Sequence, residues 1–197
     1  MRVLGAVTSW FLFVLSFTLL YRVSGVVMGL GGSCASGGPY EIAVECPGNV
    51  ALFAPLSIWG GLIAVAIAIV FTQGFAVQLT TWAWPILFCG LGFAFVLSRD
   101  PTGYLVGGVF LVMGLVPLVL EVRASPQRVL LGRNSADGAR FYEGERARKS
   151  LLSPGTPNPQ GAVQPNAGHW LLGLAVPVIS GALGYLLAGI LFTAAVG

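Results

Sequence analysis

Residues 50–98 contain no Asp, Glu, Lys, Arg or His, and residues 103–120 and 171–197 are equally free of charge. Only 9% of the 197 residues are charged, whereas a soluble domain carries about 25% charged residues. Because so few charges cannot cover a globular surface with polar groups, the solvent of this chain must be lipid. The sequence therefore predicts an all-α integral membrane protein.

Five apolar runs set the number of membrane crossings, because a helix needs about 20 apolar residues to cross a hydrocarbon core of ~30 Å. The third and fourth runs are separated only by Arg99-Asp100-Pro101-Thr102, a turn too short to cross a bilayer, so these two helices form an antiparallel hairpin. We expect Pro55 to kink the second helix and Pro177 to interrupt the fifth. The chain is then a single membrane domain, residues 1–197, with helices at about 4–30, 50–72, 81–98, 103–120 and 170–195.

The first apolar run has two alternative interpretations. A signal peptide would use Arg2 as its basic region, and Gly31-Gly32-Ser33-Cys34 is similar to a lipoprotein acylation site. The run is longer than the hydrophobic region of most signal peptides, and Gly31 stands where an acylation site needs an aliphatic residue. A first transmembrane helix is the favoured interpretation.

The distribution of basic residues predicts the orientation. Five helices place residue 1, the link 73–80 and the long hydrophilic loop 121–168 on one side of the membrane. That side carries Arg2 and seven further basic residues of the ten in the chain. By the positive-inside rule it is the cytoplasmic side, so the N-terminus is inside and the C-terminus outside. The loop of residues 31–49 then lies in the oxidising compartment outside.

The long loop is basic in its first part and proline-rich in its second. A short interfacial helix is an option for residues 138–152, and residues 153–168 are expected to be an extended or disordered linker. We expect the basic residues to contact anionic lipid headgroups; the alternative is that they act as topology determinants only. Nucleic-acid binding is excluded, since no recognised module accompanies the charge. The residues concerned are Arg123, Arg128, Arg133, Arg140, Arg146, Arg148 and Lys149.

The cysteines divide into a pair and a single residue. Cys34 and Cys46 enclose a short loop and are predicted to form a structural disulfide, worth roughly 3 kcal/mol for a loop of this length. A redox pair is the alternative, but redox pairs are usually Cys-x-x-Cys and need further cysteines to pass electrons on. Cys89 lies within the third helix and is interpreted as a small packing residue.

Arg22 is the one charge inside an apolar run. It has two interpretations: an intramembrane cation in an ion or substrate path, or an interface anchor that reaches the headgroups beside Tyr21. The second is favoured, because the apolar residues before Arg22 already nearly span a bilayer.

No catalytic, metal-binding or cofactor-binding constellation is found. His169 is the only histidine and cannot by itself build a zinc or haem site. The glycines lie within apolar runs, where Gly25-x-x-x-Gly29 and Gly103-x-x-x-Gly107 are candidate pairs for close helix packing. The uncharged helices 2 to 5 argue against a proton-coupled carrier, although not against a pore lined by backbone or hydroxyl groups.

The loop Cys34-Ala35-Ser36-Gly37-Gly38-Pro39-Tyr40 with Cys46-Pro47 resembles a loop of uncharacterised multi-pass membrane proteins of actinobacteria. The resemblance implies a bacterial plasma membrane protein and brings no activity. The function expected is therefore a non-catalytic accessory or scaffold subunit, with other membrane proteins and the lipid bilayer as partners and no cofactor. Two alternatives stay open: a channel or uncoupled transporter for a small solute, and a lipid-acting membrane enzyme.

Overall fold

The computed structural model describes residues 2–30, 34, 44–48, 50–72, 77–97, 101–124, 141–142, 162–163 and 167–196, and five helices within them are long and apolar enough to cross a membrane. This confirms the prediction of five long apolar helices. They are α1 (Arg2–Gly29), α2 (Val50–Phe71), α3 (Leu79–Leu97), α4 (Pro101–Ala124) and α7 (Ala167–Val196).

The fourth helix is longer than predicted at both ends. It begins at Pro101, in the segment that the sequence suggested would be a turn. The first position of a helix suits proline, because its fixed φ is already helical and the N–H that it lacks would have no helical acceptor there. The helix continues to Ala124, so Arg123 lies in its last turn, where a cation interacts favourably with the helix dipole.

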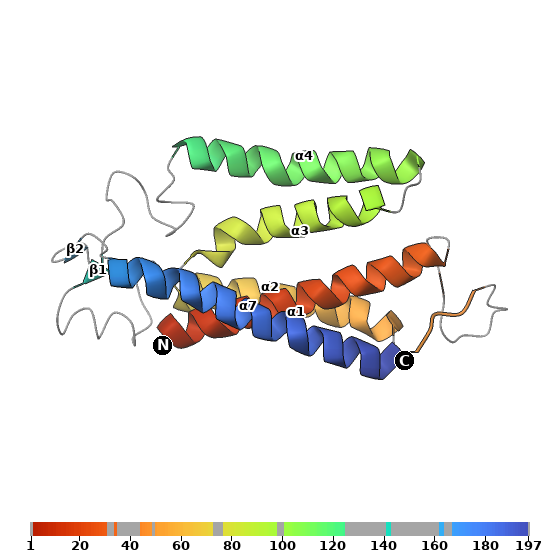
Figure 1. Cartoon of the computed structure of the whole chain (residues 1–197), viewed down its shortest axis with the longest axis horizontal. Helices are drawn as coiled ribbons and strands as arrows, with labels where there is room; N and C mark the ends of the chain where they lie inside the picture. The colour runs from red at the N-terminus through yellow and green to blue at the C-terminus, as the bar shows by residue number, and fades with distance from the viewer. Residues whose placement is uncertain are drawn as a thin grey trace.

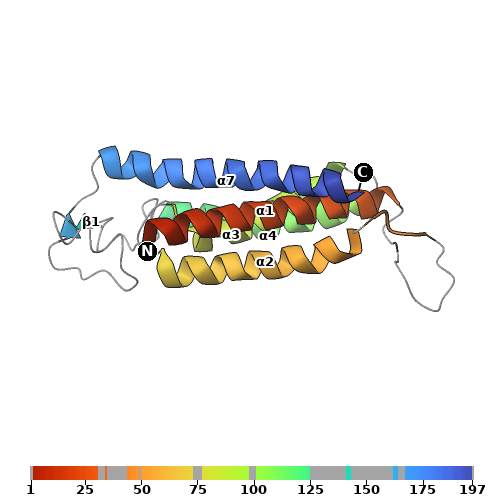
Figure 2. The same ribbon diagram turned by 90° about the horizontal axis from the view of Figure 1, so that it is seen from below.

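The helices form a three-helix unit and a hairpin beside it. Successive helices run in opposite directions, and α1 packs between α2 and α7 (Figures 1 and 2). Helices α3 and α4 pack closely on each other; α3 also touches α1 and α2, whereas α4 is the outermost helix (Figure 1). The N-terminus lies at one end of the molecule, and the C-terminus lies at the other (Figure 1).

Two apolar clusters hold the three-helix unit and join it to α3. The first combines residues of α1, α2 and α3, namely Trp10, Phe13, Ala64, Ala68 and Leu79. The second lies further along α1 and combines α1, α2 and α7 through Leu19, Val23, Val50, Ala188 and Phe192. Helix α1 is therefore the element around which the other helices of the unit are arranged.

Close backbone approach accompanies these clusters. A Cβ at Gly184 of α7 would lie 2.5 Å from the carbonyl oxygen of Phe11 on α1. A Cβ at Gly60 of α2 would overlap the hydroxyl of Ser16, also on α1. Small residues let membrane helices come close enough for extensive van der Waals contact, so these two glycines set the spacing of α2 and α7 around α1.

Helix α7 continues through Pro177, so the predicted interruption at this residue is wrong. Proline has no N–H, and the carbonyl of Gly173 therefore lacks its helical donor. The backbone N–H of Val77, before α3, donates to this carbonyl at 3.3 Å. A freed carbonyl is tolerated within a membrane helix when a neighbouring element supplies a donor.

The same compensation joins α4 to α3. Pro117 leaves the carbonyl of Met113 without its helical donor. The indole Nε1 of Trp84 on α3 donates to that carbonyl at 3.0 Å. The proline of one helix and the tryptophan of its neighbour therefore act together to tie the hairpin.

A two-stranded antiparallel pair is the β structure among the described residues. Strand β1 (Phe141–Tyr142) pairs with β2 (Ala162–Val163), with Phe141 opposite Val163 and Tyr142 opposite Ala162. The interfacial helix considered for residues 138–152 is therefore wrong at Phe141 and Tyr142, whose aromatic side chains favour strands. The rest of that segment lies outside the described residues.

Candidate functional site

Arg22 lies on the side of α1 that faces α7, near the end of the molecule that carries the C-terminus. Its guanidinium carbon is 5.7 Å from the centroid of the Phe192 ring. Its neighbours in the chain, Leu19 and Val23, pack with Val50, the first residue of α2. Arg22 is therefore level with the first turn of α2, at one end of the bundle and not in its middle. This position favours the interface interpretation of Arg22 over an intramembrane path.

An open groove of about 630 Å³ lies beside Arg22. Arg22 of α1 forms the charged wall of the groove, and residues of α7 form the other walls. The α7 residues are spaced i, i+1, i+4 and so on, which places them along one face of the helix. They are Tyr185, Leu186, Gly189, Ile190, Thr193 and Ala194.

Gly189 makes the room for the arginine. A Cβ at this position would lie 3.5 Å from Nη2 of Arg22, so the guanidinium rests against the backbone of α7. One turn further on, the Thr193 hydroxyl donates to the Gly189 carbonyl at 2.9 Å. The floor of the groove is thus helix backbone, and a larger side chain at residue 189 would extend into the space.

Arg22 has no acidic partner within the described part of the chain. Among the acidic residues, Glu45 alone has a side chain that the structure describes. This side chain is exposed and forms no ion pair with Arg22. The contact with Phe192 is a cation–π interaction, which uses none of the five N–H donors of the guanidinium. The groove therefore presents a half-buried cation whose N–H donors are not taken up by any carboxylate among the described side chains.

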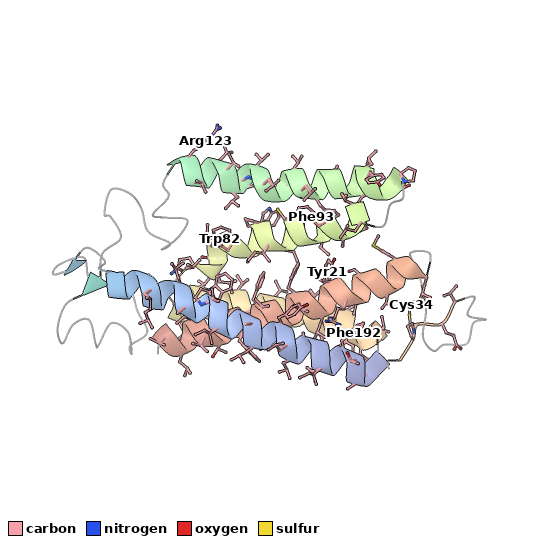
Figure 3. The ribbon with its side chains drawn as sticks, in the orientation of Figure 1. Tyr21, Cys34, Trp82, Phe93, Arg123 and Phe192 are labelled. Carbon is pink, nitrogen blue, oxygen red and sulfur yellow. A yellow bond between two sulfur atoms is a disulfide. The ribbon has the colours of Figure 1, made fainter. Side chains whose placement is uncertain are left out.

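The predicted disulfide is present: Cys34 and Cys46 are bonded, with their Cα atoms 5.0 Å apart. Cys46 packs against the apolar cluster that includes Leu19 and Val23, so the bridge is anchored near the part of α1 that carries Arg22. Figure 3 shows Cys34 at the same end of the molecule as Phe192. Residues 35–43, which the bridge encloses together with Val44 and Glu45, lie outside the described residues.

A turn leads from the bridge into α2. The N–H of Val50 donates to the Pro47 carbonyl at 3.3 Å, and Gly48 between them has a φ of 49°. This left-handed conformation strains residues that carry a Cβ. The bridge and the glycine turn together fix the chain at the start of α2, whereas Val44 before them stays exposed.

Of the basic residues predicted to contact lipid headgroups, the structure describes only Arg123, and this residue does not line the groove. Arg123 is exposed in the last turn of α4, at the opposite end of the molecule from Cys34 and Phe192 (Figure 3). The remaining members of the set lie outside the described residues. They are Arg128, Arg133, Arg140, Arg146, Arg148 and Lys149.

Cys89 packs in the hairpin, where a Cβ on Gly114 would lie 2.6 Å from its sulfur, in agreement with a packing role. His169 belongs to the first turn of α7. Among the described residues, no three His, Cys, Asp or Glu side chains gather in a way that could hold a metal ion.

Sequence reasoning found Arg22 but missed its partners. Gly189 was one of several small residues in the last helix, and Phe192 and Thr193 carried no signal of their own. Only the packing of α1 against α7 places these residues beside Arg22, and the sequence does not show which helices pack together.

Comparison of the chain with protein-family models, with curated proteins and with solved structures finds no match. The resemblance of the cysteine loop to actinobacterial membrane proteins is untested by these comparisons and stays a prediction.

Proposed function

We propose that the protein crosses the bacterial plasma membrane five times, with its N-terminus in the cytoplasm, and serves as a non-catalytic accessory or scaffold subunit of a membrane assembly. The five long apolar helices support a multi-pass membrane protein. The excess of basic residues in the loop 121–168 supports the orientation, since such residues are retained on the cytoplasmic side.

The observation that carries the accessory role is the isolation of α4. This helix packs substantially only on α3 among the described helices, through a narrow line of buried small residues that includes Gly103, Gly107 and Gly114. Its other faces carry exposed apolar side chains such as Leu105, Val112 and Leu120, and α4 is the outermost helix (Figure 1). Gly108 opens onto one of these faces, and a Cβ added there would meet no atom of another helix within 4 Å. Such a face lets a helix of another subunit approach closely.

Three of the buried serine hydroxyls support packing more than a solute path. Ser9 donates to the carbonyl of Ala6 at 3.1 Å, and Ser57 to that of Phe53 at 2.5 Å. Ser180 bonds in the same way to the carbonyl of Val176. A hydroxyl that is bonded to its own helix has its donor satisfied, so these side chains offer a passing solute little. The channel alternative therefore has less support than the accessory role.

We further propose that the basic residues of the loop 121–168 contact anionic headgroups of the cytoplasmic leaflet. Each basic residue close to such a surface contributes about 1 kcal/mol of attraction, which salt weakens.

Photo-cross-linking in native membranes tests the accessory role. A benzoylphenylalanine at Val112, which is 60% exposed on the Gly108 side of α4, should yield a protein adduct of one defined mass. Ile179 on α7 is 61% exposed and serves as the matched control, where lipid adducts alone are expected. If both positions give lipid adducts alone, and the protein purifies without a stoichiometric partner in mild detergent, the accessory role is wrong.

A further inference from the structure

We propose that the groove between α1 and α7 binds a phospholipid with a net negative headgroup. Arg22 holds the phosphate, and the exposed face of α7 holds the beginning of an acyl chain. The assignment of this lipid to the outer leaflet rests on the proposed orientation of the chain, whereas the binding chemistry does not.

The charge of Arg22 is the first step toward this ligand. The guanidinium is half-buried next to the apolar ring of Phe192 and has no acidic partner among the described residues. A cation partly withdrawn from water between apolar helices is costly unless an anion accompanies it. Arginine binds phosphate oxygens through parallel N–H donors, so its donors match a phosphodiester.

The arrangement of polar and apolar walls is the second step. Helix α7 runs toward the end of the molecule that carries Arg22, so Leu186 lies about one turn deeper than Ile190, and Thr193 lies further out. Leu186 and Ile190 are exposed apolar side chains in line with the groove. An amphiphile with its charge at Arg22 and its chain along these residues satisfies both parts of the groove. A free anion would leave the apolar wall unused.

The size and position of the groove agree with this ligand. Its volume of about 630 Å³ falls in the range of about 300–1,000 Å³ that is typical of small-molecule sites. The missing side chain at Gly189 leaves space directly in front of the guanidinium. Zwitterionic headgroups are disfavoured, because no carboxylate among the described side chains contacts the groove to receive their ammonium group.

The test uses the purified full chain in detergent micelles with two diazirine-labelled lipids of the same acyl composition. One is phosphatidylglycerol and the other is phosphatidylcholine, each present at low concentration so that annular contact is rare. Peptide mass spectrometry reads the labelling of residues 185–194 separately from labelling of the basic loop. We expect phosphatidylglycerol to label this segment preferentially in the wild-type protein.

Four variants test the residues. Arg22→Gln should lower phosphatidylglycerol labelling of residues 185–194 by about tenfold, as expected for the loss of a charge-assisted hydrogen bond. Arg22→Lys, which keeps the charge without the paired donors, should show a smaller loss. Gly189→Leu should block the groove while Arg22 remains, which keeps the test decisive if Arg22→Gln does not fold. Arg123→Gln, a matched arginine at the opposite end of the molecule, should leave this labelling unchanged.

Equal labelling by the two lipids, or labelling that Arg22→Gln and Gly189→Leu leave unchanged, would show ordinary annular lipid and overturn the proposal. Displacement of phosphatidylglycerol by millimolar inorganic phosphate would make the groove a site for free anions and overturn its assignment to lipid. The measurement needs neither a partner subunit nor a sided membrane. A negative result therefore leaves the accessory role intact, and failure to find a partner leaves the lipid site intact.

Discussion

Gly107→Ala should lower the free energy of unfolding by about 2–3 kcal/mol, the range of a strongly overpacked core position. A Cβ at Gly107 on α4 would lie 2.7 Å from the carbonyl oxygen of Gly92 and 3.1 Å from the backbone nitrogen of Val96, both on α3. Backbone atoms cannot rotate away as a side-chain end can. The two helices must therefore separate, and the hydrogen bond from Trp84 to the Met113 carbonyl is weakened with them.

Gly108→Ala is the matched control for this variant. Gly108 is the next residue of the same helix, and a Cβ there would meet no atom within 4 Å. Alanine favours the helix over glycine by up to about 1 kcal/mol, so this change should be neutral or slightly stabilising. Unfolding by dodecyl sulfate titration, followed by tryptophan fluorescence, measures both variants. Equal losses for the two would show that α3 and α4 do not touch through Gly107.

Replacement of Cys34 and Cys46 by serine should lower stability by about 3 kcal/mol, because the disulfide restricts the unfolded chain across a loop of this length. The two cysteines are 12 residues apart in sequence. The helices should still insert, since insertion depends on their apolar length and internal hydrogen bonds. The loss should appear as a lower melting temperature in detergent.

Thiol labelling with a membrane-impermeant reagent provides the control for this variant. The wild-type protein should label at Cys34 and Cys46 only after reduction, and Cys89→Ser, which changes the cysteine outside the bridge, should not alter that pattern. Labelling of both residues before reduction would mean that no bridge forms in the cell. An unchanged melting temperature in the double variant would mean that the loop adds nothing to the stability of the helix ends.

The helices were predictable because length and lack of charge determine them. Each apolar run is long enough to span a bilayer as a helix, which satisfies its own backbone hydrogen bonds. Length and hydropathy can be read directly from consecutive residues. The observed helix boundaries differ from the predicted ones where a helix extends beyond its most apolar residues. Helix α3 begins at the buried Leu79, two residues earlier than expected. Helix α4 extends past its apolar run through Arg123, which a helix end tolerates.

The helix contacts were not predictable, because they depend on which side of each helix meets a neighbour. The sequence marks two close-packing glycine pairs in the same way. Gly103 and Gly107 are buried on the side of α4 that meets α3, whereas nothing approaches within 4 Å of a Cβ at Gly25 or Gly29. The expected interruption at Pro177 failed for a similar reason, since its compensating donor, Val77, lies far away in the sequence.

The candidate site has one part that was predictable from the sequence and one part that was not. Arg22 was identifiable from sequence because a lone cation in an apolar run is rare. Its environment was not, because Gly189 and Phe192 come from a helix that is separated from α1 by three others in the chain. The disulfide was predictable because Cys34 and Cys46 lie in one short loop.

The most direct test of a five-span protein with a cytoplasmic N-terminus is a reporter that is active only in the cytoplasm, inserted in turn near Asn158 and near Gly38 and fused after Gly197. We expect activity at Asn158 and none at Gly38 or Gly197. Activity at Gly38 and Gly197 with none at Asn158 would contradict the proposed orientation, and activity at both Asn158 and Gly197 would contradict a fifth membrane crossing.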